Sequence, residues 1–302
     1  MITLGINCQS DKRNIGVEPC VVVPGQKKGH ILVDPLWELD LTTETFNNAY
    51  VLEQVQLGNM RFVGGAFGVT TETPDDTKEE STSGEMSVVR KAMPVVTTTV
   101  KKGYEFQAGI YGLQGENVFG VLEIFETGII GACVSKDGTK LTANQVGMYN
   151  VKTFQDNDGT NSASTIIEYQ LTNVGQYNQD RVYLTNLDFD PNKVGNIIDV
   201  KLTGTADASD NRVYIKAVWA RNTSYNISIF ATANFGLTID GVEDTISAVV
   251  WDSTNNRYSI TPTTALTAGE SVVVRLRDTT IPTAKVGNKF YKGVSPAITV
   301  VA

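Results

Sequence analysis

The chain has 302 residues, of which 41% are hydrophobic and 19% charged, and this composition excludes an intrinsically disordered protein. The net charge of −8 excludes a protein that binds nucleic acid by neutralising its phosphates. An acidic surface could still line a channel through which nucleic acid passes without binding. The three cysteines, Cys8, Cys20 and Cys133, form no CxxC pair. Free thiols are therefore expected rather than a zinc site, with a Cys8–Cys20 disulfide as the alternative.

Residues 1–29 are predicted to form an extended N-terminal arm, because glycine and proline are frequent there and periodicity is absent. Apolar pieces at Ile2, Leu4, Ile6 and 21–23 favour an arm that lies on a neighbouring subunit over a free one. The sequence has neither a signal-peptide pattern nor an apolar run of about 18 residues. We therefore expect folding in a cytoplasm and no membrane insertion.

Residues 30–192 are predicted to form the main domain, a β-sandwich or jelly-roll-like fold. Val, Ile, Thr, Tyr and Phe are frequent in it, and many segments alternate apolar and polar residues as half-buried strands do. Turn signals such as Asp137-Gly138 separate the segments. The predicted strands cover residues 30–41, 49–57, 60–68, 86–101, 117–125, 129–135, 165–172 and 181–189.

Two segments of this domain carry helix signals. Residues 42–49 are predicted to form one or two helical turns, with Thr42 or Thr43 as the N-cap. Residues 104–113 have apolar side chains near helical spacing, interrupted by Gly109 and Gly112, so a short helix and an irregular segment are equally weighted alternatives there.

An acidic loop is predicted at residues 70–85. The segment contains Pro74 and carries six acids against one lysine. It is either a mobile solvated loop or an interaction loop that becomes ordered on contact with a partner.

The chain changes character near residues 190–196, where short strands and turns replace the glycine-rich apolar stretches. Residues 193–302 are predicted to form a smaller C-terminal immunoglobulin-like β-sandwich, since about 100 residues suffice for one. The predicted strands of this part cover residues 197–203, 212–220, 226–231, 246–252, 257–261, 271–277 and 297–301.

Motifs that carry chemistry are scarce. A histidine-based triad would need the single histidine, His30, but no GxSxG motif is present, and His30 is interpreted as a loop or strand-edge residue. No GxxxxGK[ST] or GxGxxG sequence precedes a helix, and one histidine argues against a His-based metal site. We therefore predict no enzyme activity, no cofactor, and no catalytic, cofactor-binding or metal-binding residues.

Several segments leave a weaker alternative open. The glycines of residues 63–68 are interpreted as a bulge or close strand packing rather than a phosphate site. Residues 156–161 are interpreted as a turn rather than a calcium loop, and Asp188 and Asp190 as turn formers. A paired-carboxylate glycosidase needs no motif. However, the three tryptophans that might line a sugar cleft are far apart in sequence and are predicted to be core or sheet-packing residues: Trp37, Trp219 and Trp251.

The segment 84–124, GEMSVVRKAMPVVTTTVKKGYEFQAGIYGLQGENVFGVLEI, resembles structural proteins of tailed phages and prophages of Bacteroidetes. The resemblance extends over residues 60–190 through Asp137-Gly138-Thr139, Gly147-Met148-Tyr149 and 167–173. The C-terminal stretches LTIDGVEDTISAVVWDSTNNRYSIT and ALTAGESVVVRL resemble immunoglobulin-like domains attached to phage tail and capsid proteins.

This resemblance implies a structural virion protein assembled in the host cytoplasm. A tail tube subunit is the first expectation, with its partners being further copies of itself and other virion proteins. A double jelly-roll major capsid protein and a decoration protein are alternatives, and so is a carbohydrate- or surface-binding module using loops 254–256 and 278–285. We expect residues 1–29 and 70–85 to make the contacts between subunits, and expect no specific nucleic-acid binding.

Overall fold

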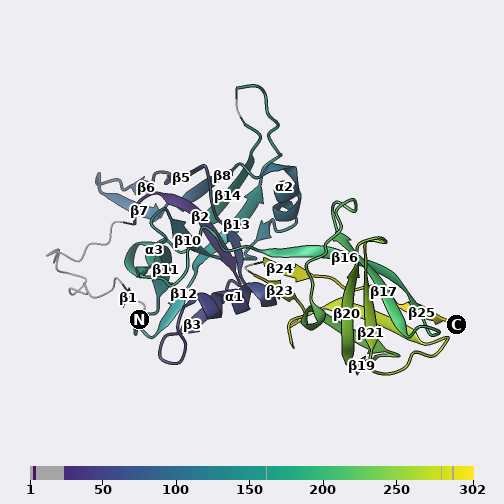
Figure 1. The fold of residues 1–302 in the computed structure, drawn as a ribbon. Coiled ribbons are helices and arrows are strands. Elements are labelled where there is room, and N and C mark those ends of the chain that lie inside the picture. Colours follow the sequence, from purple (N-terminus) through teal and green to yellow (C-terminus); the bar gives the residue numbers. More distant parts are fainter. Residues whose placement is uncertain (1–2, 5–23, 161, 280, 288) are drawn as a thin grey trace. The chain divides into compact units, whose positions relative to one another are not determined.

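The computed structural model describes residues 3–4, 24–160, 162–279, 281–287 and 289–302 (Figure 1). They belong to two compact units, Met1–Leu52 with Asn59–Val194 and Glu53–Gly58 with Gly195–Ala302. Most elements are strands, and the described residues also include three α-helices and one 3-10 helix. The predicted all-β class is confirmed.

The first unit is built on a curled sheet of 13 strands, whose central path runs β1-β15-β11-β10-β13-β14-β8-β5. A separate two-stranded sheet pairs β6 with β7. The strands of this unit are β1 (Thr3–Leu4), β2 (Lys27–Val33), β3 (Glu38–Asp40), β4 (Arg61–Val63), β5 (Gly68–Glu72), β6 (Thr77–Glu80), β7 (Met86–Arg90), β8 (Val95–Val100), β9 (Gly115–Glu116), β10 (Gly120–Phe125), β11 (Ile130–Val134), β12 (Lys140–Thr142), β13 (Asn144–Val151), β14 (Thr165–Leu171) and β15 (Arg181–Thr185).

The burial of these strands follows their sequence pattern. In β8 and β14 every second side chain is buried, as expected where one face of a strand packs on a core. β10 and β11 are buried along their whole length, which matches sequences that are apolar except for Glu123 of β10. Curling of the sheet brings Val96, Ile167 and Leu171 into one core with Leu32 and Val121.

The helix α1 spans Asn48–Leu57 and replaces two predicted elements. The predicted helix at 42–49 and the predicted strand at 49–57 are both wrong. The side chain of Asn47 accepts a hydrogen bond from the Tyr50 backbone N–H at 2.9 Å, so the helix begins there rather than at Thr42. Val51 and Val55, one helical turn apart, are buried.

The other two α-helices, α2 and α3, lie in the first unit. α2 spans Gly103–Tyr111, which confirms the helical alternative for residues 104–113, and buries Gln107 and Ile110. α3 spans Val174–Gln179 and was not predicted, although Asn173 caps it by accepting from the Gln176 N–H at 3.0 Å.

The predicted loop at 70–85 is wrong. Residues 70–72 lie in β5 and pair with β8, and residues 77–80 form β6, which pairs with β7 in a hairpin. The hairpin turn is closed by the hydrogen bond from the Gly84 N–H to the Ser81 carbonyl, with φ of +81° at Gly84. The predicted strand 86–101 is correspondingly divided into β7 and β8, with Pro94, which has no N–H, in the break.

The predicted arm, residues 1–29, extends too far along the chain, because β2 begins at Lys27 and pairs with both β10 and β4. Thr3 and Leu4 pair with Thr185 and Leu184 of β15. The rest of the predicted arm up to residue 23, including Cys8 and Cys20, lies outside the described residues.

The second unit is a ten-stranded, curled sheet with the central path β19-β18-β22-β25-β16-β17-β21-β20. Its core includes Val213, Ile215, Leu237, Tyr258 and Val274. The predicted strand at 226–231 is not formed. The elements are β16 (Ile197–Asp207), β17 (Arg212–Trp219), the 3-10 helix η1 (Thr232–Asn234), β18 (Phe235–Ile239), β19 (Val242–Asp244), β20 (Ile246–Asp252), β21 (Arg257–Pro262), β22 (Ser271–Leu276), β23 (Ala284–Val286), β24 (Lys289–Lys292) and β25 (Ile298–Val301).

Candidate interaction surface

The β6–β7 hairpin is exposed on both of its faces. Every residue of both strands is solvent-exposed, including Met86 at 68%, Val88 at 47% and Val89 at 57%. Because side chains alternate along a strand, Met86 and Val88 lie on one face and Val89 on the other. A two-stranded hairpin in water is marginally stable by itself, so exposed apolar side chains on both faces mark a surface suited to a partner.

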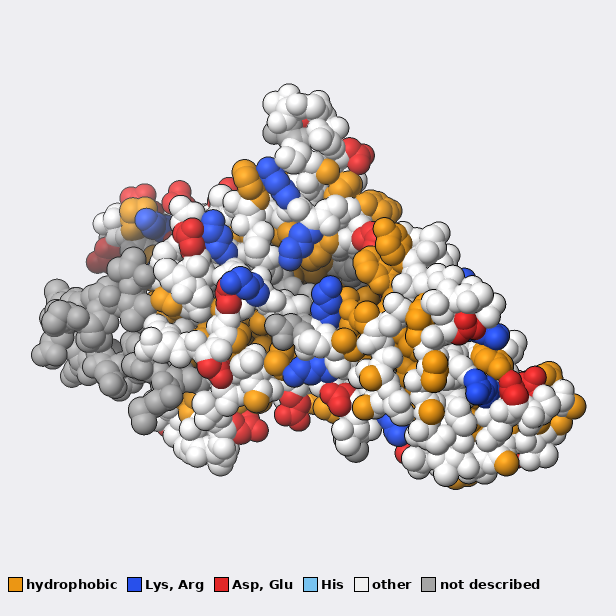
Figure 2. Space-filling view, viewed as in Figure 1, with side chains coloured by type: hydrophobic (Ala, Val, Ile, Leu, Met, Phe, Trp, Pro, Cys, Tyr) orange, Lys and Arg blue, Asp and Glu red, His pale blue; other side chains and the backbone are white. Residues whose placement is uncertain are grey.

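The base of the hairpin is fixed by Asp76. Its carboxylate forms a 2.7 Å ion pair with Lys91 and accepts the Ala92 backbone N–H at 2.8 Å. The hydrogen bond from Lys91 is the main reason that the pKa of Asp76 lies below its ordinary value. In Figure 2 acidic side chains gather at the hairpin around a hydrophobic one, as the composition of residues 70–85 predicts.

A second exposed surface lies at the other end of β5 and β8. Phe67 is 69% exposed, and the Lys101 ammonium lies 3.5 Å from the centre of its ring. Tyr104 and Tyr111, seven residues apart on one face of α2, are also exposed. Lysine or arginine and hydrophobic side chains lie side by side in the region of α2 in Figure 2. We call Phe67, Lys101, Lys102, Tyr104 and Tyr111 the cationic surface.

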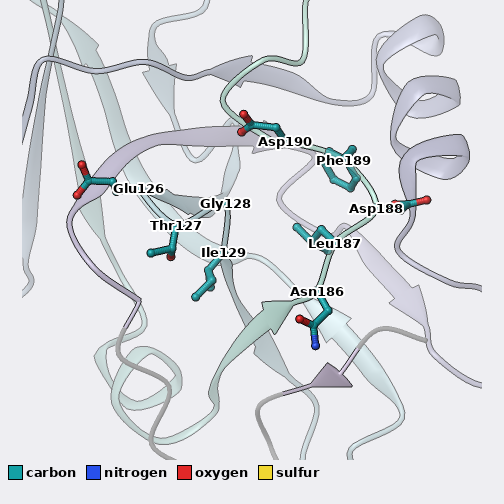
Figure 3. A pocket seen from close by; sticks show the side chains of 9 residues that line it. All are labelled: Glu126, Thr127, Gly128, Ile129, Asn186, Leu187, Asp188, Phe189 and Asp190. Atoms are coloured by element: carbon teal, nitrogen blue, oxygen red, sulfur yellow. The ribbon is translucent and has the colours of Figure 1, made fainter.

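A hollow of about 610 Å³ lies between the β10–β11 turn and the segment that follows β15 (Figure 3). Three acids line it, but each already has a partner. Asp188 accepts the Asn48 N–H at 2.8 Å, Asp190 pairs with Lys193 at 3.1 Å, and Glu126 lies 3.9 Å from Lys28. Since each of these acids is already paired within the chain, the three do not form a ligand-binding site in the hollow.

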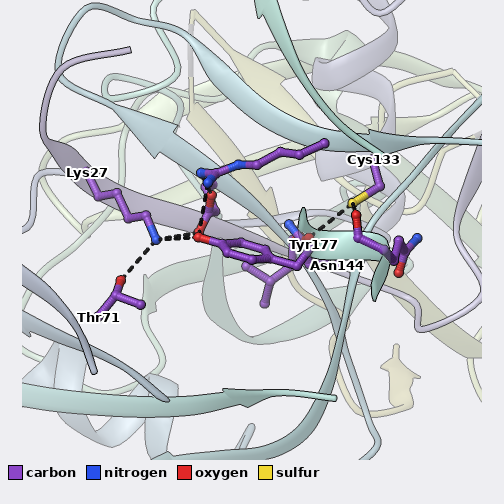
Figure 4. Close-up of polar contacts among 9 residues, drawn as sticks. Lys27, Thr71, Cys133, Asn144 and Tyr177 are labelled. Carbon is purple, nitrogen blue, oxygen red and sulfur yellow. Dashed lines mark hydrogen bonds and ion pairs between the residues drawn. The ribbon is translucent and has the colours of Figure 1, made fainter. Parts of the chain in front are cut away.

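Glu123 is the centre of a buried polar cluster in the first unit. Its fully buried carboxylate forms ion pairs with Arg181 and, at 2.7 Å, with Lys27. Lys27 also donates to Tyr177 at 3.2 Å and to Thr71 at 3.0 Å, as Figure 4 shows. The cluster therefore joins β2, β5, β10, β15 and α3, and its one buried carboxylate is paired with two cations within the fold.

His30 lies in a different environment from the predicted one. It is fully buried in β2, between β10 and β4, and is not a loop or strand-edge residue. Its Nε2 is 3.0 Å from the Tyr149 hydroxyl, and its ring packs edge-on against Tyr149 and Tyr169. Burial lowers the pKa of His30 to about 3, so the imidazole is neutral at physiological pH.

Cys133 is a buried free thiol 3.1 Å from the Asn144 side-chain oxygen (Figure 4). Burial, reinforced by the charge of Glu123, raises the pKa of Cys133 to about 12. The thiol is therefore protonated and poorly nucleophilic at neutral pH.

The segments for which a weaker alternative was open are turns and a connecting segment. Residues 64–67 connect β4 to β5, and an added Cβ at Gly64 would lie 3.3 Å from the Asn192 backbone. At 156–160 the Asp158 side chain accepts the Thr160 N–H at 2.9 Å, as in a turn. Asp190 accepts the Asn192 N–H at 3.0 Å, also as in a turn. No group of three His, Cys, Asp or Glu side chains among the described residues is placed to hold a metal ion.

The tryptophans divide into two kinds. Trp37 and Trp251 are partly buried and pack against Phe46 and Tyr258. Trp219 is exposed and stacks on exposed Tyr225, with ring centres 5.5 Å apart, so its predicted core position is wrong. Its place at the end of β17, before the turn at Asn222, was the available signal.

Within the described part of the chain, no helix has the length and apolar character needed to cross a bilayer. Comparison of the chain with protein-family models, curated proteins and solved structures yields no match.

Proposed function

We propose that this chain is a structural subunit that self-assembles, of the kind that forms the tail tube of a phage particle. The observation that carries the proposal is the β6–β7 hairpin, which presents apolar side chains to solvent on both faces. Contacts with neighbouring copies would bury Met86, Val88 and Val89, and would stabilise a hairpin that has no packing face of its own.

The sheet edges support the same proposal. β5 ends the central path of the first sheet and β20 ends that of the second, so each has one ladder edge without a partner among the described residues. β20, with the sequence ISAVVWD, carries a single charge, at Asp252. Natural edge strands are usually shielded by charges or proline, and an unshielded one is suited to pairing with another chain.

The acidic composition is compatible with a tube that conducts DNA. A wall with a net charge of −8 per subunit repels phosphates, which lets a nucleic acid pass without binding. The second unit, with its own core and about 110 residues, would decorate the outside as an immunoglobulin-like domain.

The test removes the hairpin and keeps the pairing of β5 with β8, with the new glycine taking the place of Pro94, whose carbonyl accepts the Leu171 N–H at 2.9 Å. Glu72 and Val95 are paired neighbours on β5 and β8, so Asn-Gly in place of residues 73–94 joins them by a short turn. We expect this variant to retain the melting transition of the first unit and to lose polymerisation in electron micrographs. Normal polymers from a folded variant would refute the role of the hairpin.

A carbohydrate- or surface-binding module is the second candidate, and one observation favours it. Trp219 and Tyr225 form an exposed aromatic stack on the second unit. Exposed aromatic rings are frequent anchors of binding surfaces. This candidate predicts a monomer that binds glycans and loses the binding on Trp219→Ala, with the hairpin deletion having no effect.

A further inference from the structure

We propose that the β6–β7 hairpin of one copy docks on the cationic surface of the next copy, so that the subunits join head to tail. This inference rests on the proposed self-assembly and identifies the two surfaces that meet. It commits to a second copy of this chain as the occupant, because the two surfaces complement each other in charge, in apolar character and in position.

The charges of the two surfaces are opposite. The hairpin and the segment leading to it carry Asp75, Asp76, Glu79, Glu80 and Glu85, against Lys78 in the same stretch and Arg90 and Lys91 at the hairpin base. Asp76 is matched by Lys91, whereas Glu79 and Glu80 lie exposed on β6. Glu80 lies on the face of Met86 and Val88, and Glu79 lies on the face of Val89, so each face carries an acid that would meet the cations of a neighbour.

The cationic surface offers two ammonium groups beside aromatic rings. Lys101 lies over Phe67 and donates to Ser162 at 3.3 Å, and the Lys102 ammonium lies 5.2 Å from the Phe106 ring centre. One acid, Glu105, lies near these two ammonium groups in the sequence, on the first turn of α2. Desolvation lowers the pKa of Lys102, and a carboxylate partner would oppose that shift.

The apolar side chains also correspond. Met86 and Val88 share one hairpin face with Lys78 and Glu80, as the pairing of β6 with β7 requires. Phe67, Tyr104 and Tyr111 provide exposed rings at the other surface. Apolar contact framed by ion pairs is the usual construction of a protein interface.

The two surfaces lie at opposite ends of one strand pair. Glu72 and Val95 are paired at the hairpin end of β5 and β8, and Gly68 and Thr99 are paired at the other end. Four residue steps of extended strand separate these ends by about 13 Å. The hairpin and α2 accordingly lie on either side of β5 and β8 in Figure 1. A contact between two different patches is heterologous, and its repetition gives a ring or an open helical polymer.

Charge reversal tests the inference. The hairpin variant is Glu79→Lys/Glu80→Lys, and the surface variant is Lys101→Glu/Lys102→Glu. Each should fold normally by circular dichroism, because all four side chains are exposed. We expect each alone to raise the critical concentration for assembly at least ten-fold, since like charges then meet in every contact.

Complementation gives the decisive readout. An equimolar mixture of the two variants should assemble as the unaltered chain does, because each hairpin then meets a surface of opposite charge on the other variant. A chain carrying all four changes should also assemble. The matched control Glu44→Lys/Glu53→Lys changes two exposed acids outside both surfaces and should assemble normally.

Four results would overturn the inference. Normal assembly of either variant alone, or failure of both the mixture and the fourfold variant, would show that other surfaces meet while leaving self-assembly intact. An unaltered chain that stays monomeric would remove the proposed function and this contact with it. Salt tests the same contact without variants, since raising sodium chloride from about 0.05 M to about 0.5 M should increase the critical concentration, and an unchanged critical concentration would contradict a contact made by opposite charges.

Discussion

Replacing His30 with glutamine should remove a pH dependence of stability that the buried imidazole imposes on the first unit. Burial lowers the pKa of His30 to about 3 in the folded state, against 6.5 when the residue is exposed. Between these values the unfolded chain binds a proton that the folded chain does not. The free energy of unfolding therefore falls as pH drops below about 6.5, and the loss levels off near pH 3.

The magnitude follows from the interval between the two pKa values. At pH 5, which lies about 1.5 units below the unfolded pKa, the loss is about 2 kcal/mol relative to pH 8. Glutamine does not titrate and keeps an amide that can bond to the Tyr149 hydroxyl, the partner of His30 at 3.0 Å. The variant should therefore lose about 2 kcal/mol less stability than the unaltered chain over this interval.

The assay is urea unfolding at both pH values, followed by hydrogen exchange in peptides that cover β2 and β10. These peptides report on the first unit alone, which matters because the chain has two compact units. His30 is the only histidine in the chain, and the carboxylates are common to both proteins, so the difference isolates one group. An equal pH dependence in both proteins would refute the neutral buried imidazole.

Three other substitutions or treatments have expected outcomes. Glu123→Gln leaves Lys27 and Arg181 without their carboxylate and should destabilise the first unit by about 3 kcal/mol in urea unfolding, and no loss would contradict the assigned ion pairs. Gly204→Ala would place a Cβ 2.0 Å from the Tyr214 carbonyl oxygen, so the second unit should melt at a lower temperature while the first is unchanged, and unaltered melting would contradict that close approach. Cys133, with a pKa of about 12, should react with iodoacetamide at pH 8 roughly 10³-fold more slowly than it does in urea, as measured by peptide mass spectrometry, and equal rates would contradict its burial.

The sequence predicted the all-β class well, because strand burial follows residue alternation directly. In β14 the buried Ile167, Tyr169 and Leu171 are every second residue, and this pattern can be seen without a structure. The turn at Asp137-Gly138 likewise follows from its residue types, with φ of +75° at Gly138.

The errors in the fold prediction have two causes: competition between strand and helix periodicity, and strand pairing between distant parts of the sequence. The sequence VLEQVQL of α1 contains two β-branched valines and alternates at its end, yet Val51 and Val55 also have helical spacing, and the cap at Asn47 decides for the helix. His30 was misplaced because the pairing of β2 with both β4 and β10 depends on contacts distant in sequence. No local signal distinguishes that position from a strand edge.

The candidate interaction surface was predicted only in part. Its acidic composition marked residues 70–85 correctly as an unusual polar segment, but β6 has no apolar alternation from which a strand would be recognised. The cationic surface was missed because its members come from three places in the chain. Phe67 precedes β5, Lys101 and Lys102 follow β8, and the tyrosines belong to α2.

The measurement that tests self-assembly most directly is negative-stain electron microscopy of the purified full chain, with size-exclusion light scattering on the same sample. The proposed function predicts tubes or stacked rings. Trimers or closed shells would favour the capsid alternative over the tube. A chain that remains strictly monomeric at high concentration would contradict self-assembly and favour the binding module.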